Sequence, residues 1–222
     1  GDKINAGANN GEGKITRIKD TEMDLQVGDM LVSRVNAPLM SLAWKLVKEK
    51  KNVFVVGHQI GIGLINLIKK INPKIVESDG TEIANDDTIK LCEQLEVWRD
   101  HQIKLFQNRK SDTSAQQINL NDKVDCIIEL SGECKSVKEL TAFIKVIFEN
   151  DLPSIRLSSI HRAKGLEADK VYFYNPSNVP HPLAKSKEAR KQEMNLKFVA
   201  ITRAIKELIY VEVPDKKMKG GE

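Results

Sequence analysis

Several features that define whole classes of protein are missing from this chain of 222 residues. No apolar run approaches the ~20 residues that a membrane-spanning helix needs, and the first five residues lack the apolar core of a signal peptide. The three cysteines, Cys92, Cys126 and Cys134, show no CxxC spacing, and the four histidines are scattered along the chain. A disulfide framework and a Cys/His zinc site are therefore unsupported. We expect a reducing, cytoplasmic location, no metal site and no membrane partner.

The chain also lacks the GxxxxGK[ST] loop, in which a lysine and a hydroxyl hold nucleotide phosphates and their metal ion. Residues 61–64 (GIGL) place two glycines at an expected strand-to-helix junction, where backbone N–H groups can approach an anion. Without the lysine and the hydroxyl, a tight turn that opens a packed helix is the better interpretation. The chain alone is therefore not expected to hydrolyse a nucleotide by the P-loop route.

Charge of neither sign dominates, but the charges are unevenly placed. Lysine and arginine number 35 against 31 acidic residues, a net charge of +4. Residues 1–150 carry 21 basic and 22 acidic groups, whereas residues 151–222 carry 14 and 9. A polyanion such as nucleic acid or a nucleotide phosphate is therefore sought first in the last third, although ordinary surfaces also show imbalances of this size.

Strand and helix patterns alternate at both ends of the chain. Residues 29–35 form an apolar run suited to a buried strand, Pro38 suits the first turn of a helix reaching Lys51, and residues 53–56 form a short β-branched run. Three later stretches also have strand character: 154–160, 170–174 and 207–213. A helix is expected over residues 187–204. This order predicts an α/β fold, with a parallel sheet flanked by helices.

The middle of the chain shows helical patterns. From Thr81 to about Arg109 there is no glycine or proline, and Leu91, Leu95 and Trp98 recur at helical steps, which predicts one long amphipathic helix. Residues 113–149 continue with helical spacing. We therefore predict an all-helical insertion into an α/β sheet.

These patterns divide the chain into four parts. They are a flexible lead with a possible edge strand at 1–26, an α/β domain at 27–72 and 150–213, the helical insertion at 73–149, and a disordered tail at 214–222.

The strongest chemical signal is the polar stretch SSIHRAKGLE at residues 158–167, which leaves an expected strand. Gly165 permits a backbone turn, and Glu167 can accept hydrogen bonds from sugar hydroxyls. His161 and the Ser159 hydroxyl can donate to phosphate oxygens. On composition alone, a solvated loop is an equally good interpretation.

A second signal is QEMNLKFVAITRA at residues 192–204. Leu196, Val199 and Ala200 make an apolar helical face that ends near Arg203. An arginine held rigidly at a packed helix end suits a γ-phosphate, whose charge develops during phosphoryl transfer. Taken alone, an arginine that caps helix carbonyls is the commoner case.

Together the two segments resemble motifs V and VI of the UvrD/Rep family of superfamily 1 DNA helicases. HRAKGLE is similar to T-x-H-x-x-K-G-L-E, and Glu193 through FVAITRA is similar to E-x-x-L-x-Y-V-A-x-T-R-A. Residues 34–37 (RVNA) are similar to the R-T-N-A that follows a strand early in the second motor domain. The sequence departs from these motifs at Val35, Ser159 and Phe198, and only Ser159 keeps the hydroxyl.

The resemblance implies the second of two RecA-like motor domains, with ATP bound in the cleft between them. Arg203 would be the catalytic arginine finger at the γ-phosphate, Glu167 would accept the ribose hydroxyl, and Gly165 would belong to the same cofactor-binding loop. The backbone of single-stranded DNA would be touched by Arg34, Asn36, Ser159 and His161.

The implied protein is a bacterial or phage-encoded, ATP-dependent DNA helicase or translocase that serves DNA repair or replication. Its partners would be single-stranded and duplex DNA, ATP with Mg²⁺, and an N-terminal motor domain of the same polypeptide that carries the P-loop and holds the metal. By analogy, the KGLE loop favours the 3′-to-5′ branch. The alternative is a non-catalytic nucleic-acid-binding or interaction module derived from a helicase, favoured by the missing P-loop.

Overall fold

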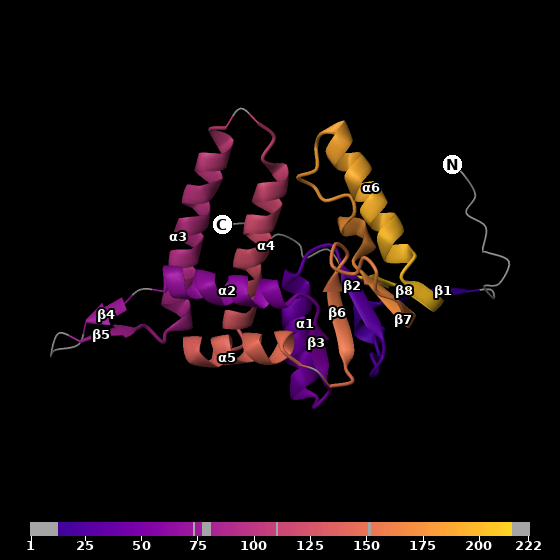
Figure 1. The fold of residues 1–222 in the computed structure, drawn as a ribbon, viewed down its shortest axis with the longest axis horizontal. Coiled ribbons are helices and arrows are strands. Elements are labelled where there is room, and N and C mark those ends of the chain that lie inside the picture. The colour runs from indigo at the N-terminus through magenta and orange to yellow at the C-terminus, as the bar shows by residue number, and fades with distance from the viewer. Residues whose placement is uncertain (1–12, 73, 77–80, 110, 151, 215–222) are drawn as a thin grey trace.

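The computed structural model describes residues 13–72, 74–76, 81–109, 111–150 and 152–214. A six-stranded sheet, parallel throughout, forms its centre, in the order β1-β8-β7-β2-β6-β3 (Figure 1). The strands are β1 (Lys14–Lys19), β2 (Met30–Ser33), β3 (Val53–Val55), β6 (Ile155–Ser159), β7 (Ala168–Tyr174) and β8 (Ala204–Glu212). This sheet, flanked by helices, confirms the predicted α/β RecA-like fold.

Burial on both faces of the sheet explains why residues 30–32 of β2 are apolar. All four residues of β2 are buried. In the parallel register Ser33 of β2 lies beside Ser159 of β6, so these two strands end at the same level. The segments that leave β2 and β6 therefore start next to each other.

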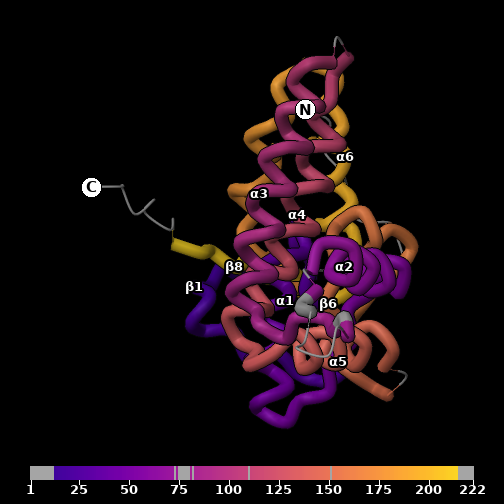
Figure 2. Tube along the Cα trace, turned by 90° about the vertical axis from the view of Figure 1, so that its left-hand side faces the viewer, coloured from indigo at the N-terminus to yellow at the C-terminus, as the bar shows by residue number. Residues whose placement is uncertain are grey.

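Three helices accompany the sheet segments: α1 (Ala37–Lys48), α2 (His58–Ile71) and α6 (Lys187–Ile201). The middle of the chain supplies three more: α3 (Thr88–Gln107), α4 (Ser114–Ser131) and α5 (Val137–Phe148). Short 3-10 turns lie at Asp20–Glu22 and Pro176–Asn178. Figures 1 and 2 show α3, α4 and α6 extending in the same direction from the sheet.

Two apolar clusters form the core. The larger one joins the sheet to the insertion, since Leu31 of β2 and Val55 of β3 share it with Leu95 of α3 and Ile127 of α4. The smaller cluster lies between the sheet and α6, where Phe173 and Ala200 are fully buried. The insertion thus shares its core with the sheet.

The middle of the chain is not entirely helical. Strands β4 (Lys74–Val76) and β5 (Glu82–Ala84) form a small antiparallel sheet, so the helix predicted from Thr81 begins at Thr88. The Asp87 carboxylate sets this start, because it accepts hydrogen bonds from the backbone N–H groups of Ile89 (2.8 Å) and Lys90 (3.3 Å).

The GIGL segment is not a turn. Both glycines lie inside α2, and the turn before that helix is made by Gly57, whose φ is +124°. Gly61 serves close packing, because a Cβ there would lie 2.8 Å from the ring of Phe148 on α5.

Parts of the predicted lead and tail, residues 1–12 and 215–222, lie outside the described residues. The strand expected near residues 14–18 is present as β1, at one edge of the sheet.

Candidate functional site

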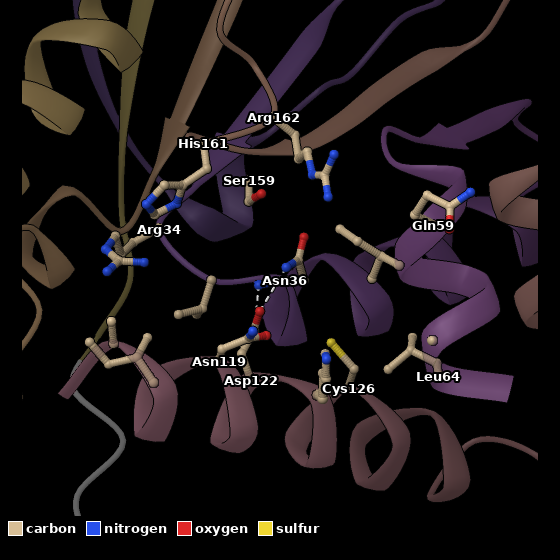
Figure 3. A pocket seen from close by; sticks show the side chains of 16 residues that line it. Arg34, Asn36, Gln59, Leu64, Asn119, Asp122, Cys126, Ser159, His161 and Arg162 are labelled. Carbon is tan, nitrogen blue, oxygen red and sulfur yellow. Dashed lines mark hydrogen bonds between the residues drawn. The ribbon is translucent and has the colours of Figure 1, made fainter. Parts of the chain in front are cut away.

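A pocket of about 410 Å³ opens at the carboxyl ends of β2 and β6 (Figure 3). Its lining includes all four residues predicted to touch DNA: Arg34, Asn36, Ser159 and His161. The first two follow β2, the third ends β6, and the fourth lies in the turn after it. Ligands of parallel α/β sheets bind outside the carboxyl ends of strands, which is where these residues meet.

The insertion forms the opposite wall of this pocket. Asn119, Asp122 and Cys126 of α4 line it, together with Gln59 and Leu64 of α2 (Figure 3). The predicted DNA residues therefore face the insertion across the pocket.

Asp122 connects the two walls. Its Oδ1 accepts hydrogen bonds from the backbone N–H groups of Asn36 (2.6 Å) and Ala37 (3.0 Å), and its Oδ2 accepts one from Asn36 Nδ2 (2.7 Å). The carboxylate thus satisfies N–H groups at the start of α1, where negative charge is favoured. The Oδ1 atom of Asn36 is buried and finds no hydrogen-bond partner among the described residues.

Arg34 forms a buried ion pair with Glu193 of α6. Its Nε donates to Oε2 at 2.8 Å and its Nη2 to Oε1 at 2.6 Å, and the two side chains are only 6% and 5% exposed. The backbone N–H of His181 donates to the same carboxylate at 3.0 Å. Arg34 therefore joins the end of β2 to α6, a role that the sequence analysis missed, and its contact with DNA stays a prediction.

The charges around this ion pair affect three titratable groups. Burial alone raises the pKa of Glu193, but hydrogen bonds from Arg34 and from the His181 backbone outweigh it and leave the pKa below its ordinary value. His161 and His181 both have lowered pKa values, first because they are partly removed from water and then because Arg34 is positively charged. Both imidazoles are therefore mainly neutral at pH 7.

A second group of predicted residues meets where α6 ends. Arg203 is partly buried, and three hydrogen bonds hold its guanidinium: Nε to the carbonyl of Val199 (3.0 Å), Nη1 to the carbonyl of Leu166 (3.1 Å) and Nη2 to the hydroxyl of Thr202 (3.0 Å). Because a guanidinium has five N–H donors, two remain for a ligand. Arg203 can therefore cap helix carbonyls and still bind a phosphate.

Glu167 is held beside Arg203. The residue before it, Leu166, accepts the bond from Arg203 Nη1, and the residue after it, Ala168, donates its N–H to the Arg203 carbonyl at 3.1 Å. The Glu167 side chain is exposed. Gly165 has φ +85°, so the turn that presents this loop requires the freedom of glycine. The fold therefore brings together three predicted cofactor residues, which come from two separate motifs.

This second group suits part of a nucleotide. An exposed carboxylate can accept hydrogen bonds from ribose hydroxyls, and the remaining guanidinium donors can meet phosphate oxygens. Within the described ranges, no cluster of three or more His, Cys, Asp or Glu side chains could hold a metal ion. In the same ranges, no helix is both long and apolar enough to cross a membrane.

Comparison with known proteins identifies the family of the chain. The family model for the UvrD-like helicase C-terminal domain matches residues 5–213. A search of curated proteins finds no match. Since the family match extends over both motif segments, the sheet and the insertion, the chain belongs to the UvrD-like helicase C-terminal domain family.

Proposed function

We propose that this chain is the second motor domain of an ATP-dependent DNA helicase or translocase. In this role it supplies the arginine finger, the ribose contact and part of the single-stranded DNA path to a P-loop motor domain of the same polypeptide. The observation that carries the proposal is that one pocket gathers Arg34, Asn36, Ser159 and His161, while Glu167 and Arg203 meet at a second place.

Two continuous segments link the proposed DNA and nucleotide contacts. The loop after β6 runs from Ser159 and His161 to Glu167. Helix α6 holds Arg34 through the carboxylate of Glu193. From Glu193 to its last residue, Ile201, the helix extends about 12 Å at 1.5 Å per residue, and Arg203 follows two residues later. A displacement of either segment would move both groups of residues, as coupling of hydrolysis to strand movement requires.

The contacts of Arg203 support its proposed role. Its side chain is fixed by α6 and by the loop that carries Glu167, so loss of a γ-phosphate from its remaining donors would act on both segments. A guanidinium already held in place loses little rotamer freedom when it meets a developing charge.

The test is DNA-stimulated ATP hydrolysis by the polypeptide that joins this chain to a P-loop motor domain. Arg203→Ala and Arg203→Lys should lower the rate by about 10³- to 10⁵-fold, as expected for an arginine finger. Lys191→Ala, which removes an exposed cation from the same helix, should leave the rate unchanged. Circular dichroism checks that each variant is folded. Near-normal turnover by Arg203→Ala would refute the assignment.

The second candidate is a non-catalytic nucleic-acid-binding module, because the chain lacks the P-loop. Such a module needs the pocket at the strand ends but not Glu167 or Arg203. Folded Glu167→Ala and Arg203→Ala variants that leave every activity of the longer polypeptide intact would favour it.

A further inference from the structure

A second pocket, of about 430 Å³, adjoins the first one between α2, α3 and α4. Gly63, Asn119 and Lys123 line both pockets, so the two pockets are direct neighbours. These three helices contact one another and lie together in both views of the chain (Figures 1 and 2). The second pocket therefore begins at the proposed DNA site and leads onto the insertion.

The lining of this second pocket combines aromatic rings with positive charge. Trp98 and Phe106 of α3 are both partly exposed, and Lys70 and Lys123 approach from α2 and α4. The Lys70 Nζ atom lies 5.6 Å from the centre of the Trp98 ring, and the Arg109 guanidinium carbon lies 5.2 Å from the centre of the Phe106 ring. Each ring thus carries a cation beside it.

No aspartate or glutamate is among the described residues that line this pocket, whose other polar members are amides: Asn66, Gln116 and Asn119. Lys70 and Lys123 have no carboxylate partner in the part of the chain that the structure describes. Glu96 of α3 and Asp125 of α4 are paired with Arg99, and Asp122 of α4, which lines the first pocket, accepts hydrogen bonds at the start of α1. The pocket therefore favours an anionic occupant over a cationic one.

We propose that this second pocket continues the path of single-stranded DNA onto the insertion, with an unstacked base against Trp98 or Phe106 and backbone phosphates at Lys70 and Lys123. The inference rests on the proposed function and extends it, because it assigns a binding role to the insertion. Aromatic rings inside a positively charged groove are the usual means of binding single strands without sequence preference. The shared lining with the first pocket and the charge of this lining both favour DNA over an apolar protein segment.

Tryptophan fluorescence tests the stacking directly. The chain has two tryptophans, and Trp44 packs against Phe143 at a ring distance of 4.8 Å, outside both pockets. In Trp44→Phe, Trp98 becomes the sole reporter, and we expect an unlabelled oligo(dT) of about 16 nucleotides to quench it. In the matched variant Trp98→Phe, which reports only on Trp44, the same DNA should cause no quenching.

Affinity for labelled oligo(dT), measured by fluorescence anisotropy against salt, tests the other residues of the pocket. Phe106→Ala should weaken binding by about 5- to 150-fold, the range found for loss of one stacked base. Lys70→Gln with Lys123→Gln should weaken binding and reduce the salt slope by about 1.4, about 0.7 for each phosphate of the single strand that is no longer neutralised. The control is Lys48→Gln, since Lys48 also lies over a tryptophan ring, 4.7 Å from that of Trp44, but lines neither pocket.

Two results would overturn the inference. If the chain binds DNA without quenching of Trp98 and all variants keep wild-type affinity, the path does not enter this pocket, and the proposed function still stands on the Arg203 test. If the folded chain shows no DNA binding even at low salt, the groove does not hold DNA and another occupant, such as a protein segment, has to be sought. Failure of the proposed function itself would instead appear as normal ATP hydrolysis by Arg203→Ala.

Discussion

Replacing Glu193 by alanine should strongly destabilise the fold. The substitution leaves the Arg34 guanidinium, only 6% exposed, without its carboxylate, and it removes the acceptor of the His181 backbone N–H. Breaking a buried ion pair by removing one partner costs about 3–5 kcal/mol. Since a domain is stable by about 5–15 kcal/mol, the variant would lose a large part of its free energy of unfolding.

Urea unfolding, followed by circular dichroism, measures this loss. The control is Asp169→Ala, which breaks the pair of Lys206 with Asp169, 2.6 Å apart but with side chains 72% and 61% exposed, and which should cost less than about 1 kcal/mol. The double variant Arg34→Met with Glu193→Leu should recover most of the stability, because no unpaired charge stays buried. If Glu193→Ala costs no more than Asp169→Ala, the argument from the buried pair is wrong.

The same pair makes stability depend on pH. The pKa of Glu193 in the folded chain lies below its unfolded value of about 4.3. Its contribution is therefore complete above that value and is lost as the pH falls through the folded-state pKa. Urea midpoints measured from pH 7 downward should fall less steeply in the double variant than in the wild type.

Three further predictions concern single residues near the two walls of the pocket. Asp122→Ala removes the hydrogen-bond acceptor at the start of α1 and should lower the free energy of unfolding by about 0.5–2 kcal/mol. Hydrogen exchange at the first amides of α1 should become faster, and unchanged exchange would contradict the capping role of Asp122. Gly61→Ala should destabilise the fold by about 1–3 kcal/mol in urea unfolding, because the new Cβ meets the phenylalanine ring on α5. The control Gly63→Ala, whose Cβ meets nothing within 4 Å, should be neutral or stabilising. Equal effects of the two substitutions would refute the packing argument. Binding of single-stranded DNA should strengthen as the pH falls through the pKa of His161, which partial burial and the charge of Arg34 hold below its ordinary value, because the imidazole then becomes charged. His161→Ala should remove most of this dependence in anisotropy titrations.

Local signals made the sheet predictable from the sequence. Some strands are apolar or β-branched runs next to glycine, proline or asparagine, and β3 after Asn52 is an example. Pro38 correctly marked the first turn of α1. In each case the information lies within a few residues of the element that it specifies.

Two local predictions were wrong because a competing signal was stronger. The cap formed by Asp87 starts α3 later than the absence of glycine and proline suggested. The apolar periodicity of α2 continues through the GIGL segment, so two glycines that suggested a turn lie inside a helix. Helix periodicity over 14 residues outweighs the low helix propensity of single glycines.

The candidate site was predictable only in part. The four residues predicted to touch DNA and the three predicted to bind the nucleotide could be named because they lie in short motifs. The contacts that hold them could not, because the partners of Arg34 and Asn36 lie 159 and 86 residues away. Asp122 belongs to a helix without any motif, so only the tertiary structure shows that it meets the start of α1.

Binding of single-stranded DNA by this chain, measured against salt, is the sharpest test of the proposed DNA site. Wild-type affinity should fall as salt rises, since phosphate contacts release counterions, and the double variant His161→Ala with Asn36→Ala should lose this binding. Equal binding by the wild type and a folded double variant would contradict the account, because the DNA would then contact a surface other than the pocket at the ends of β2 and β6.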